Sequence, residues 1–311
     1  MADFDLLNIK PNIVDPSLSG KIVWFYGAPG TRKTTVASKF PKPLLAATER
    51  GYKFINGVKA VDIKSWSDVR HLVRQLKDEQ VQALYETIVW DRADTLYDYC
   101  KDYICKTQGV RELSEIAYSA GYTLARKEFA SVIRTVESLG YGMVFITHDK
   151  VNMEKQTTQD LENNAAKVIR GYADFTFLLK KEVIDDRETV IAYSQKAGAE
   201  SKSRAMYFAE SFEFTFENLK KELDKAVQKQ IEMDGIEVQV QQRKAETDRS
   251  FEEVKNSVIE LYKKFVAEEH ASLNDIAYVI QKQMQGVKIS EANESYYDQL
   301  LVIETFMLGL E

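Results

Sequence analysis

The sequence predicts an α/β fold in which a mostly parallel central sheet is flanked by helices, with a helical C-terminal region after it. Three observations lead to this prediction. Short apolar runs rich in β-branched and aromatic residues recur up to about residue 194, and such runs are typical of strands buried on both faces. A long amphipathic pattern separates two of these runs, as a helix that covers a sheet does. After about residue 216 only helical patterns remain.

Each element of the core follows from its own pattern. The run KIVWFY is apolar and lies between two glycines, so it is interpreted as a buried strand. The expected strands are 21–26, 43–47, 87–91, 143–147, 175–181 and 189–194, the last two as a pair. A short helix is expected over 33–40 and a long one over 118–139. The apolar stripe of the long helix consists of Tyr122, Ala125, Phe129, Val132, Val136 and Leu139.

The last part of the chain is expected to hold four helices. One apolar stripe consists of Phe216, Leu219, Leu223, Val227 and Ile231, and the pattern repeats from residue 251 to residue 265. A third helix is expected to begin at Ser272, whose hydroxyl can cap it while Asp275 reaches back. The fourth covers about 296–308. A helical bundle packed on the core and a stripe used for oligomerisation or a partner both fit this pattern.

We therefore expect three parts, namely an extended N-terminal arm over residues 1–20, an α/β core over 21–215 and a helical region over 216–311. The hydrophobic content of 44% supports a packed core, and the net charge of −6 does not suggest a generally basic nucleic-acid-binding protein. Cys100 and Cys105 are expected to be reduced thiols rather than a disulfide framework or a zinc site.

The sequence also bears on the compartment. Its N-terminus shows no signal peptide, and no apolar stretch approaches the roughly 20 residues that span a bilayer. We expect a cytoplasmic protein with no membrane partner.

A phosphate-binding loop is predicted between the first strand and the first helix, at GAPGTRKT. In the pattern G-x-x-x-x-G-K-[ST], backbone N–H groups surround nucleotide phosphates at the N-terminus of a helix. The lysine adds charge at the β- and γ-phosphates, and the Ser/Thr hydroxyl binds Mg²⁺. The predicted nucleotide-binding residues are Gly27, Ala28, Pro29, Gly30, Thr31, Arg32, Lys33, Thr34 and Thr35.

Arg32 departs from this pattern, because it stands where the loop usually has its last glycine. An arginine is tolerated there if its backbone keeps a negative φ, and it is strained otherwise. Its side chain can point outward, toward a phosphate or toward a neighbouring subunit. The sequence leaves these three positions open.

Two acidic residues follow predicted strands. Asp91 ends the run TIVWD, where a carboxylate suits a water-mediated contact to Mg²⁺, although it can also cap a turn. The next residue is Arg92, so no catalytic glutamate stands beside Asp91. Glu49 lies just past the strand 43–47, at the edge where ligands bind in such sheets. It is the candidate to activate the water that attacks the γ-phosphate, and the alternative is a solvated loop glutamate.

Further polar residues follow the later strands. Thr147 and His148 end the strand 143–147 and are candidates to sense the γ-phosphate, whereas a hydrogen-bonded structural histidine is the alternative. Lys196, Lys202 and Arg204 follow the last core strands. They are read either as a solvated charged turn or as cations delivered to the nucleotide of an adjacent subunit.

These blocks resemble the phage-encoded RecA-like P-loop ATPases with AAA-type domains, a group that includes single-strand annealing recombinases. The resemblance covers about residues 20–207. It rests on YGAPGTRKTT, FPKPLLAATERG, TIVWDRADTL, GYTLARKEFASVIRTVESLGYGMVFITHDK, Asp174 before a strand, and KSRA. It implies a RecA-type core that binds ATP and Mg²⁺, in a homo-oligomeric protein of the host bacterial cytoplasm.

The resemblance also implies roles for individual residues. Lys33 and Thr34 take the phosphate and metal positions, Glu49 that of the catalytic glutamate, and Asp91 that of the second acidic motif. His148 stands where the group often has a histidine. The basic motif after the sheet corresponds to Lys202 and Arg204.

Single-stranded DNA is a partner implied by the resemblance, through loops that follow the central strands. The corresponding stretch is 148–174, with the cations Lys150, Lys155, Lys167 and Arg170. It also carries Asp149, Glu154, Asp160 and Glu162 and lacks the interleaved aromatic residues of a base-stacking platform, so the composition alone does not indicate a DNA-binding patch.

Three functions remain open at this point. The first is an ATPase that binds single-stranded DNA in recombination or annealing. The second is a helicase-loader-like replication accessory protein whose C-terminal helices bind a replication or recombination protein. The third is a nucleotide-gated structural protein with little turnover.

Overall fold

The computed structural model describes residues 14–153, 156–234, 251–268, 272–284, 286–293, 296–308 and 310. The described residues form two compact units, one over 14–234 and one from residue 251 onward. Residues 1–13 of the expected N-terminal arm lie outside the described part of the chain.

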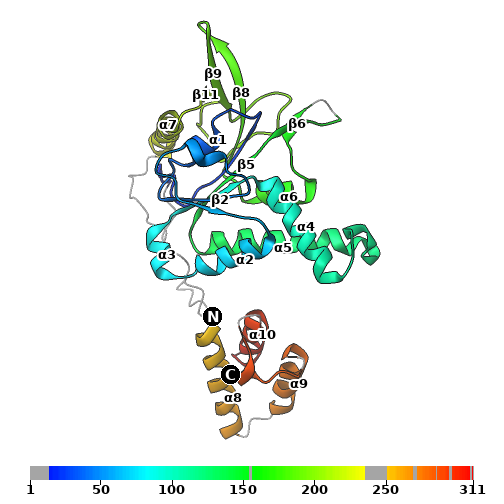
Figure 1. Cartoon of the computed structure of the whole chain (residues 1–311). Coiled ribbons are helices and arrows are strands. Elements are labelled where there is room, and N and C mark those ends of the chain that lie inside the picture. The colour runs from blue at the N-terminus through cyan, green and yellow to red at the C-terminus, as the bar shows by residue number, and fades with distance from the viewer. Residues whose placement is uncertain are drawn as a thin grey trace. The chain divides into compact units, whose positions relative to one another are not determined.

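The larger unit is built around one mixed sheet, as the sequence predicts (Figure 1). Its strands run in the order β11-β9-β8-β1-β5-β4-β2-β3, and β10 pairs with β8. The bounds are β1 (Ile22–Gly27), β2 (Pro43–Ala47), β3 (Ala60–Asp62), β4 (Thr87–Asp91), β5 (Gly142–Thr147), β8 (Phe175–Ile184), β9 (Arg187–Tyr193), β10 (Lys202–Ser203) and β11 (Ser211–Glu213). The neighbouring strands β3, β2, β4, β5, β1 and β8 are parallel to one another, and β9, β10 and β11 pair antiparallel.

Parallel register brings the carboxyl ends of the central strands to one edge of the sheet. Tyr26 of β1 is level with Thr147 of β5, and Asp91 of β4 is level with Ala47 of β2. The strands are apolar on both sides because both faces are covered. Whatever follows these four strands is therefore gathered at one edge, which is where ligands bind in open parallel sheets.

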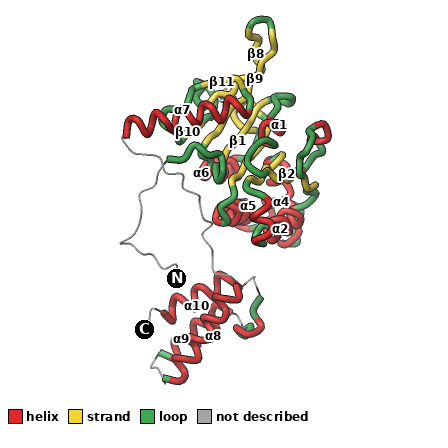
Figure 2. Tube along the Cα trace, turned by 90° about the vertical axis from the view of Figure 1, so that its left-hand side faces the viewer, coloured by secondary structure: helices red, strands yellow, loops and turns green. Residues whose placement is uncertain are grey.

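Helices cover both faces of the sheet (Figure 2). The first face carries α2 (Trp66–Gln75), α4 (Ala93–Gln108), α5 (Ala120–Ser138) and α6 (Asn163–Tyr172). The opposite face carries α1 (Lys33–Ala37) and α7 (Phe216–Asp234), and the short helix α3 (Glu79–Leu84) lies before β4. The helix expected over 118–139 is confirmed as α5, but Tyr122 is 40% exposed and does not belong to its buried stripe.

Helix α7 belongs to the larger unit, although the sequence interpretation placed it in the C-terminal region. Its residues Leu219, Leu223 and Val227 are buried in the same cluster as Phe25 and Phe177 of the sheet. An apolar stripe shows that a helix has a buried face and does not show which surface covers it. The structure therefore divides after α7, and not at residue 215.

The stretch 148–174 contains regular structure where a loop was expected. It forms the hairpin of β6 (Asp149–Val151) and β7 (Thr157–Gln159), followed by α6. In α6, Ala165, Ala166, Val168 and Ile169 are buried against the sheet. The α6 part of the expected DNA loop thus belongs to the core.

The C-terminal unit has a hydrophobic core of its own. It consists of α8 (Phe251–Ala267), α9 (Leu273–Met284), the short η4 (Ile289–Glu291) and α10 (Tyr297–Leu308). Its buried side chains include Val254, Val258, Phe265, Ile276, Leu300, Ile303 and Met307. The three helices expected here are present.

Two further expectations concern the thiols and the membrane. Cys100 and Cys105 are free and buried, and burial raises the pKa of the Cys100 thiol well above its ordinary value. Among the described residues, no helix combines the length and the apolar character needed to cross a bilayer.

Candidate functional site

The phosphate loop lies between β1 and α1, where the sequence places it. Its first glycine is enforced by packing, because a Cβ on Gly27 would lie 2.4 Å from the carbonyl oxygen of Leu179 in β8. Gly30 adopts φ 79°, a left-handed conformation that glycine reaches without strain. The sheet and the backbone together fix the path of this loop.

Lys33 is buried in the loop, and within the described part of the chain its hydrogen bonds all go to neutral oxygen atoms. Its Nζ donates to the carbonyl oxygens of Gly27 (2.7 Å) and Ala28 (2.9 Å) and to Oγ1 of Thr31 (3.2 Å). Burial lowers the pKa of Lys33 to about 8, against a smaller opposing effect of Asp91. A buried ammonium without a carboxylate in direct contact fits an anionic ligand such as a phosphate group.

Arg32 adopts the conformation that was expected to strain it. Its φ and ψ are 60° and 22°, in the left-handed region, and its side chain is exposed. The left-handed conformation costs a residue with a Cβ about 1–2 kcal/mol of free energy. The loop therefore keeps the backbone shape that a glycine would have at position 32, although an arginine stands there. The exposed side chain is compatible with all three positions left open by the sequence.

Thr34 and Asp91 meet across the site. Oγ1 of Thr34 donates to Oδ2 of Asp91 at 2.6 Å, and burial raises the pKa of the Asp91 carboxyl. No three acidic, histidine or cysteine side chains converge on a metal site within the described residues. Mg²⁺ keeps several waters and takes few protein oxygens beside phosphates, so a hydroxyl and a carboxylate in contact fit this ion.

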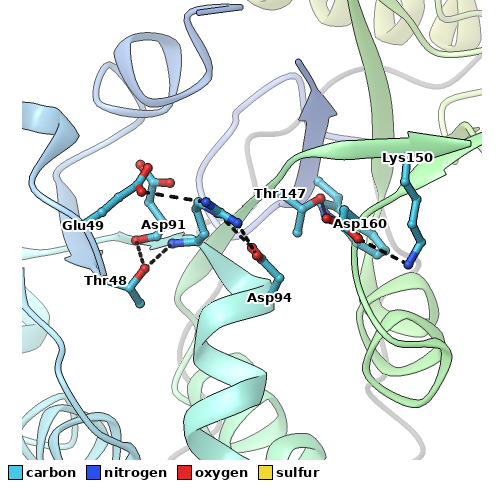
Figure 3. Close-up of polar contacts among 9 residues, drawn as sticks. Thr48, Glu49, Asp91, Asp94, Thr147, Lys150 and Asp160 are labelled. Carbon is cyan, nitrogen blue, oxygen red and sulfur yellow. Dashed lines mark hydrogen bonds and ion pairs between the residues drawn. The ribbon is translucent and has the colours of Figure 1, made fainter. Parts of the chain in front are cut away.

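The end of β2 is tied to the end of β4 (Figure 3). The Thr48 amide donates to the carbonyl oxygen of Asp91 at 2.7 Å, and the Arg92 amide donates to Oγ1 of Thr48 at 3.1 Å. The peptide bond between Asp91 and Arg92 is cis. These contacts place Glu49, the residue after Thr48, beside Arg92, with 3.8 Å between its Oε2 and Nη1 of Arg92. Glu49 and Asp91 therefore belong to one site.

Thr147 and His148 differ in their accessibility to a ligand. Thr147 is fully buried, and its Oγ1 accepts from Nε1 of Trp24 at 3.1 Å. Since that hydroxyl is used within the core, the structure does not support it as a phosphate sensor. His148 is half-buried at the site, where burial, followed by the charges of Arg92 and Lys33, lowers its pKa. A neutral imidazole beside these cations is compatible with a sensor role.

Lys202 and Arg204 are engaged within their own chain. Nζ of Lys202 donates to the carbonyl oxygen of Arg170 at 2.8 Å. Arg204 pairs with Asp174 at 3.2 Å and donates to the carbonyl oxygen of Gly171 at 2.9 Å. Both cations therefore stabilise the junction of α6 and β8. This agrees better with a charged turn than with delivery of the two cations to the nucleotide of another subunit.

The cations expected to contact DNA are divided between two elements. Lys150 pairs with Asp160 (3.4 Å), Arg170 pairs with Glu200 (3.2 Å), and Lys167 is exposed on α6. Lys155 lies outside the described residues. Two of the three described cations are thus neutralised by neighbouring acids.

Sequence reasoning missed Lys181 of β8. The end of its side chain approaches the phosphate loop, since a Cβ on Gly30 would lie 3.7 Å from its Nζ. Lys181 also pairs with Glu188 of β9 at 2.9 Å. No motif marks this residue, because the parallel pairing of β1 with β8 is what brings it to the loop.

Comparison with known proteins agrees with this geometry. The sequence model of a family described as AAA domain matches residues 19–209. The SPbeta prophage-derived uncharacterized protein YorG of Bacillus subtilis (strain 168) is 25% identical over 312 residues, which cover 96% of each of the two chains.

Proposed function

Because the chain belongs to the AAA domain family, we propose that it is an ATPase that binds ATP with Mg²⁺ and releases ADP and phosphate. The observation that carries this proposal is the contact of Thr34 with Asp91 beside the buried Lys33. Thr34 would bind Mg²⁺ and Asp91 would hold its waters. Within the described residues, no carboxylate contacts the ammonium group of Lys33 directly.

Each group has a defined task in hydrolysis. The loop amides and Lys33 bind the β- and γ-phosphates and hold them in line for attack. Thr34 and Asp91 would hold Mg²⁺, which neutralises charge on the phosphate oxygens. Glu49 orients a water and takes its proton as the water attacks the γ-phosphorus. His148, half-buried at the same edge, would sense the γ-phosphate.

The test is phosphate release by the purified chain, with Mg²⁺ and with or without single-stranded DNA, beside binding of a fluorescent ATP analogue. Lys33→Ala should abolish analogue binding. Glu49→Gln should bind the analogue within about twofold of the wild type and lose hydrolysis by about a hundredfold or more, the contribution expected of a general base. Binding without any hydrolysis by the wild type would contradict the ATPase function and favour a nucleotide-gated structural protein.

Phage origin and single-stranded DNA binding in recombination or annealing belong to the same proposal. Their support is the prophage-derived relative and the resemblance to annealing recombinases. DNA that raises hydrolysis, with an affinity that falls as salt rises, is the expected result. Lys167→Ala should weaken DNA binding more than Lys150→Ala, because Lys150 is paired with Asp160.

A replication accessory protein is the second candidate, and one observation favours it. Residues 251–311 contain five lysines, no arginine and eleven acidic residues, so they carry the whole net charge of −6. An acidic helical unit repels DNA and suits a protein partner with a basic surface. Removal of residues 251–311 that leaves DNA binding intact and ends the copurification of a replication protein would support this candidate.

A further inference from the structure

We propose that Arg92 is a positioning residue that orients Glu49 for the activation of water, an inference that rests on the proposed ATPase function. Arg92 stands directly after Asp91, where the sequence offers an arginine in place of a catalytic glutamate. The contacts of its guanidinium explain what an arginine can do at this position.

Arg92 is anchored before it reaches Glu49. Its Nε and Nη2 donate to the two carboxylate oxygens of Asp94, at 3.2 and 2.5 Å. Asp94 stands in the first turn of α4, where the helix N-terminus favours a negative charge. The Arg92 amide is held by Thr48, and its side chain is only 24% exposed. The guanidinium is therefore fixed by a bidentate pair on a rigid element.

The remaining nitrogen of Arg92 is turned to Glu49. Nη1 lies 3.8 Å from Oε2 of Glu49, and the Glu49 side chain is 55% exposed. Within the described residues, this ion pair is the one direct polar contact of the Glu49 carboxylate. Figure 3 shows both contacts leaving the same guanidinium, one toward Glu49 and one toward Asp94.

This arrangement can orient Glu49 without neutralising it. A glutamate that is half exposed at a strand end samples several rotamers, and few of them direct an oxygen at the attacking water. One fixed cation favours the rotamers that place Oε2 near it and leaves Oε1 for the water. Because Asp94 holds the shorter contacts with Arg92, the longer contact with Glu49 aligns the carboxylate and leaves it able to take a proton.

A direct contact of Arg92 with the γ-phosphate is the competing explanation. It would use Nη1, the nitrogen that faces Glu49, because Nε and Nη2 are both bound to Asp94. The two explanations differ in one measurable respect. A residue that acts through Glu49 has no effect once Glu49 has lost its carboxylate, whereas a residue that contacts the phosphate keeps its effect.

The experiment is a double-mutant cycle with full-length chains. Single-turnover hydrolysis of radiolabelled ATP by excess protein is measured for the wild type, Arg92→Gln, Glu49→Gln and the double variant. Arg92→Gln should slow hydrolysis by about tenfold to a hundredfold and change the affinity for a fluorescent ATP analogue by less than about twofold. The double variant should hydrolyse ATP no more slowly than Glu49→Gln.

Two further variants separate orientation from folding. Asp94→Asn loosens the anchor of Arg92 and should slow hydrolysis in the same direction, with the effect again absent in the Glu49→Gln background. Arg50→Gln is the matched control, because Arg50 follows Glu49 in sequence but is exposed and pairs with Asp62 at 2.7 Å. It should leave hydrolysis unchanged. Thermal unfolding of every variant shows whether it folds. If Arg92→Gln does not fold, Asp94→Asn takes its place in the double-mutant cycle.

Three results would overturn the inference. The first is a rate of Arg92→Gln equal to that of the wild type. The second is an effect of Arg92→Gln that persists in full in the Glu49→Gln background, which assigns Arg92 to the phosphate. The third is a wild type that binds the analogue and does not hydrolyse ATP, because there is then no reaction in which Arg92 could act. That last result appears before any variant is made, so a failure of the proposed function is distinguished from a failure of Arg92.

Discussion

The hydroxyl of Thr34 donates a 2.6 Å hydrogen bond to the carboxylate of Asp91, from the phosphate loop to the end of β4. The two residues are 57 positions apart in sequence. Their contact is possible because β1 and β4 flank β5 in the same parallel sheet. It places a hydroxyl and a carboxylate where one Mg²⁺ ion can use both.

Replacement of Asp91 by Asn should stabilise the protein without ligands and end its Mg²⁺-dependent binding of ATP. Burial raises the pKa of Asp91, so the folded chain binds this proton more tightly than the unfolded chain. The wild type therefore loses stability as the pH rises through the raised pKa, and Asn removes that loss. At pH 7 the free energy of unfolding in urea should rise by about 0.5–2 kcal/mol. An unstable variant would contradict the burial argument.

The affinity for ATP should fall above pH 8. Burial lowers the pKa of Lys33 to about 8 in the protein without ligand, so the ammonium charge is lost as the pH rises through that value. Binding of the polyphosphate above this pH requires uptake of one proton, which weakens binding by up to about tenfold per pH unit. Titration of a fluorescent ATP analogue at several values between pH 7 and pH 9.5 measures this effect. A constant affinity over that range would contradict it.

Arg32→Gly should stabilise the larger unit. Glycine relieves the left-handed strain of about 1–2 kcal/mol and gains some freedom in the unfolded chain, so a net increase of up to about 1 kcal/mol in the free energy of unfolding is expected. Arg32→Ala is the control, since it removes the charge and retains the Cβ. Thermal unfolding should give a higher Tm for the Gly variant than for the Ala variant.

Lys181→Ala should weaken ATP binding by about twofold to fivefold, because a partly exposed charge near the loop contributes up to about 1 kcal/mol. Hydrolysis at saturating ATP should stay unchanged, since β8 lies on the side of β1 away from β4 and Asp91. Lys180→Ala is the matched control on the other face of the strand. A lower rate at saturation would place Lys181 in the reaction instead.

Leu223→Ala in α7 should destabilise the larger unit by about 2–5 kcal/mol, because Leu223 is buried against the sheet. Lys220→Ala, at an exposed position of the same helix, should change the stability by less than about 0.5 kcal/mol. The three tryptophans, Trp24, Trp66 and Trp90, are all buried in this unit, so urea unfolding followed by their fluorescence reports on it alone. Equal stabilities would mean that α7 is not part of its core.

The strands of the core were predictable because their apolar runs are buried on both faces. β1, β2, β4 and β5 lie within a residue of the expected bounds, and β8 and β9 pair as expected. The strand β3 (Ala60–Asp62) is short and half-buried, so it leaves no such run and was missed. Periodicity identified α7 as a helix, but its place on the sheet depends on contacts that are distant in sequence.

The candidate site was predictable only where a motif carries it. Lys33, Thr34 and Asp91 follow from the phosphate loop and from a strand that ends in a carboxylate. The backbone of Arg32 does not follow, because the sequence does not state a φ angle. Contacts such as Lys181 with the loop, or Thr147 with Trp24, depend on which strands pair and on which face each side chain occupies.

The left-handed backbone of Arg32 also has a genetic consequence. Every arginine codon becomes a glycine codon by a single change of its first base. A single base change is therefore enough to replace Arg32 by glycine and relieve the backbone strain. A library made by error-prone amplification and selected for heat resistance should recover this change early, and its absence from the survivors would show that the exposed guanidinium is kept for the work of the protein.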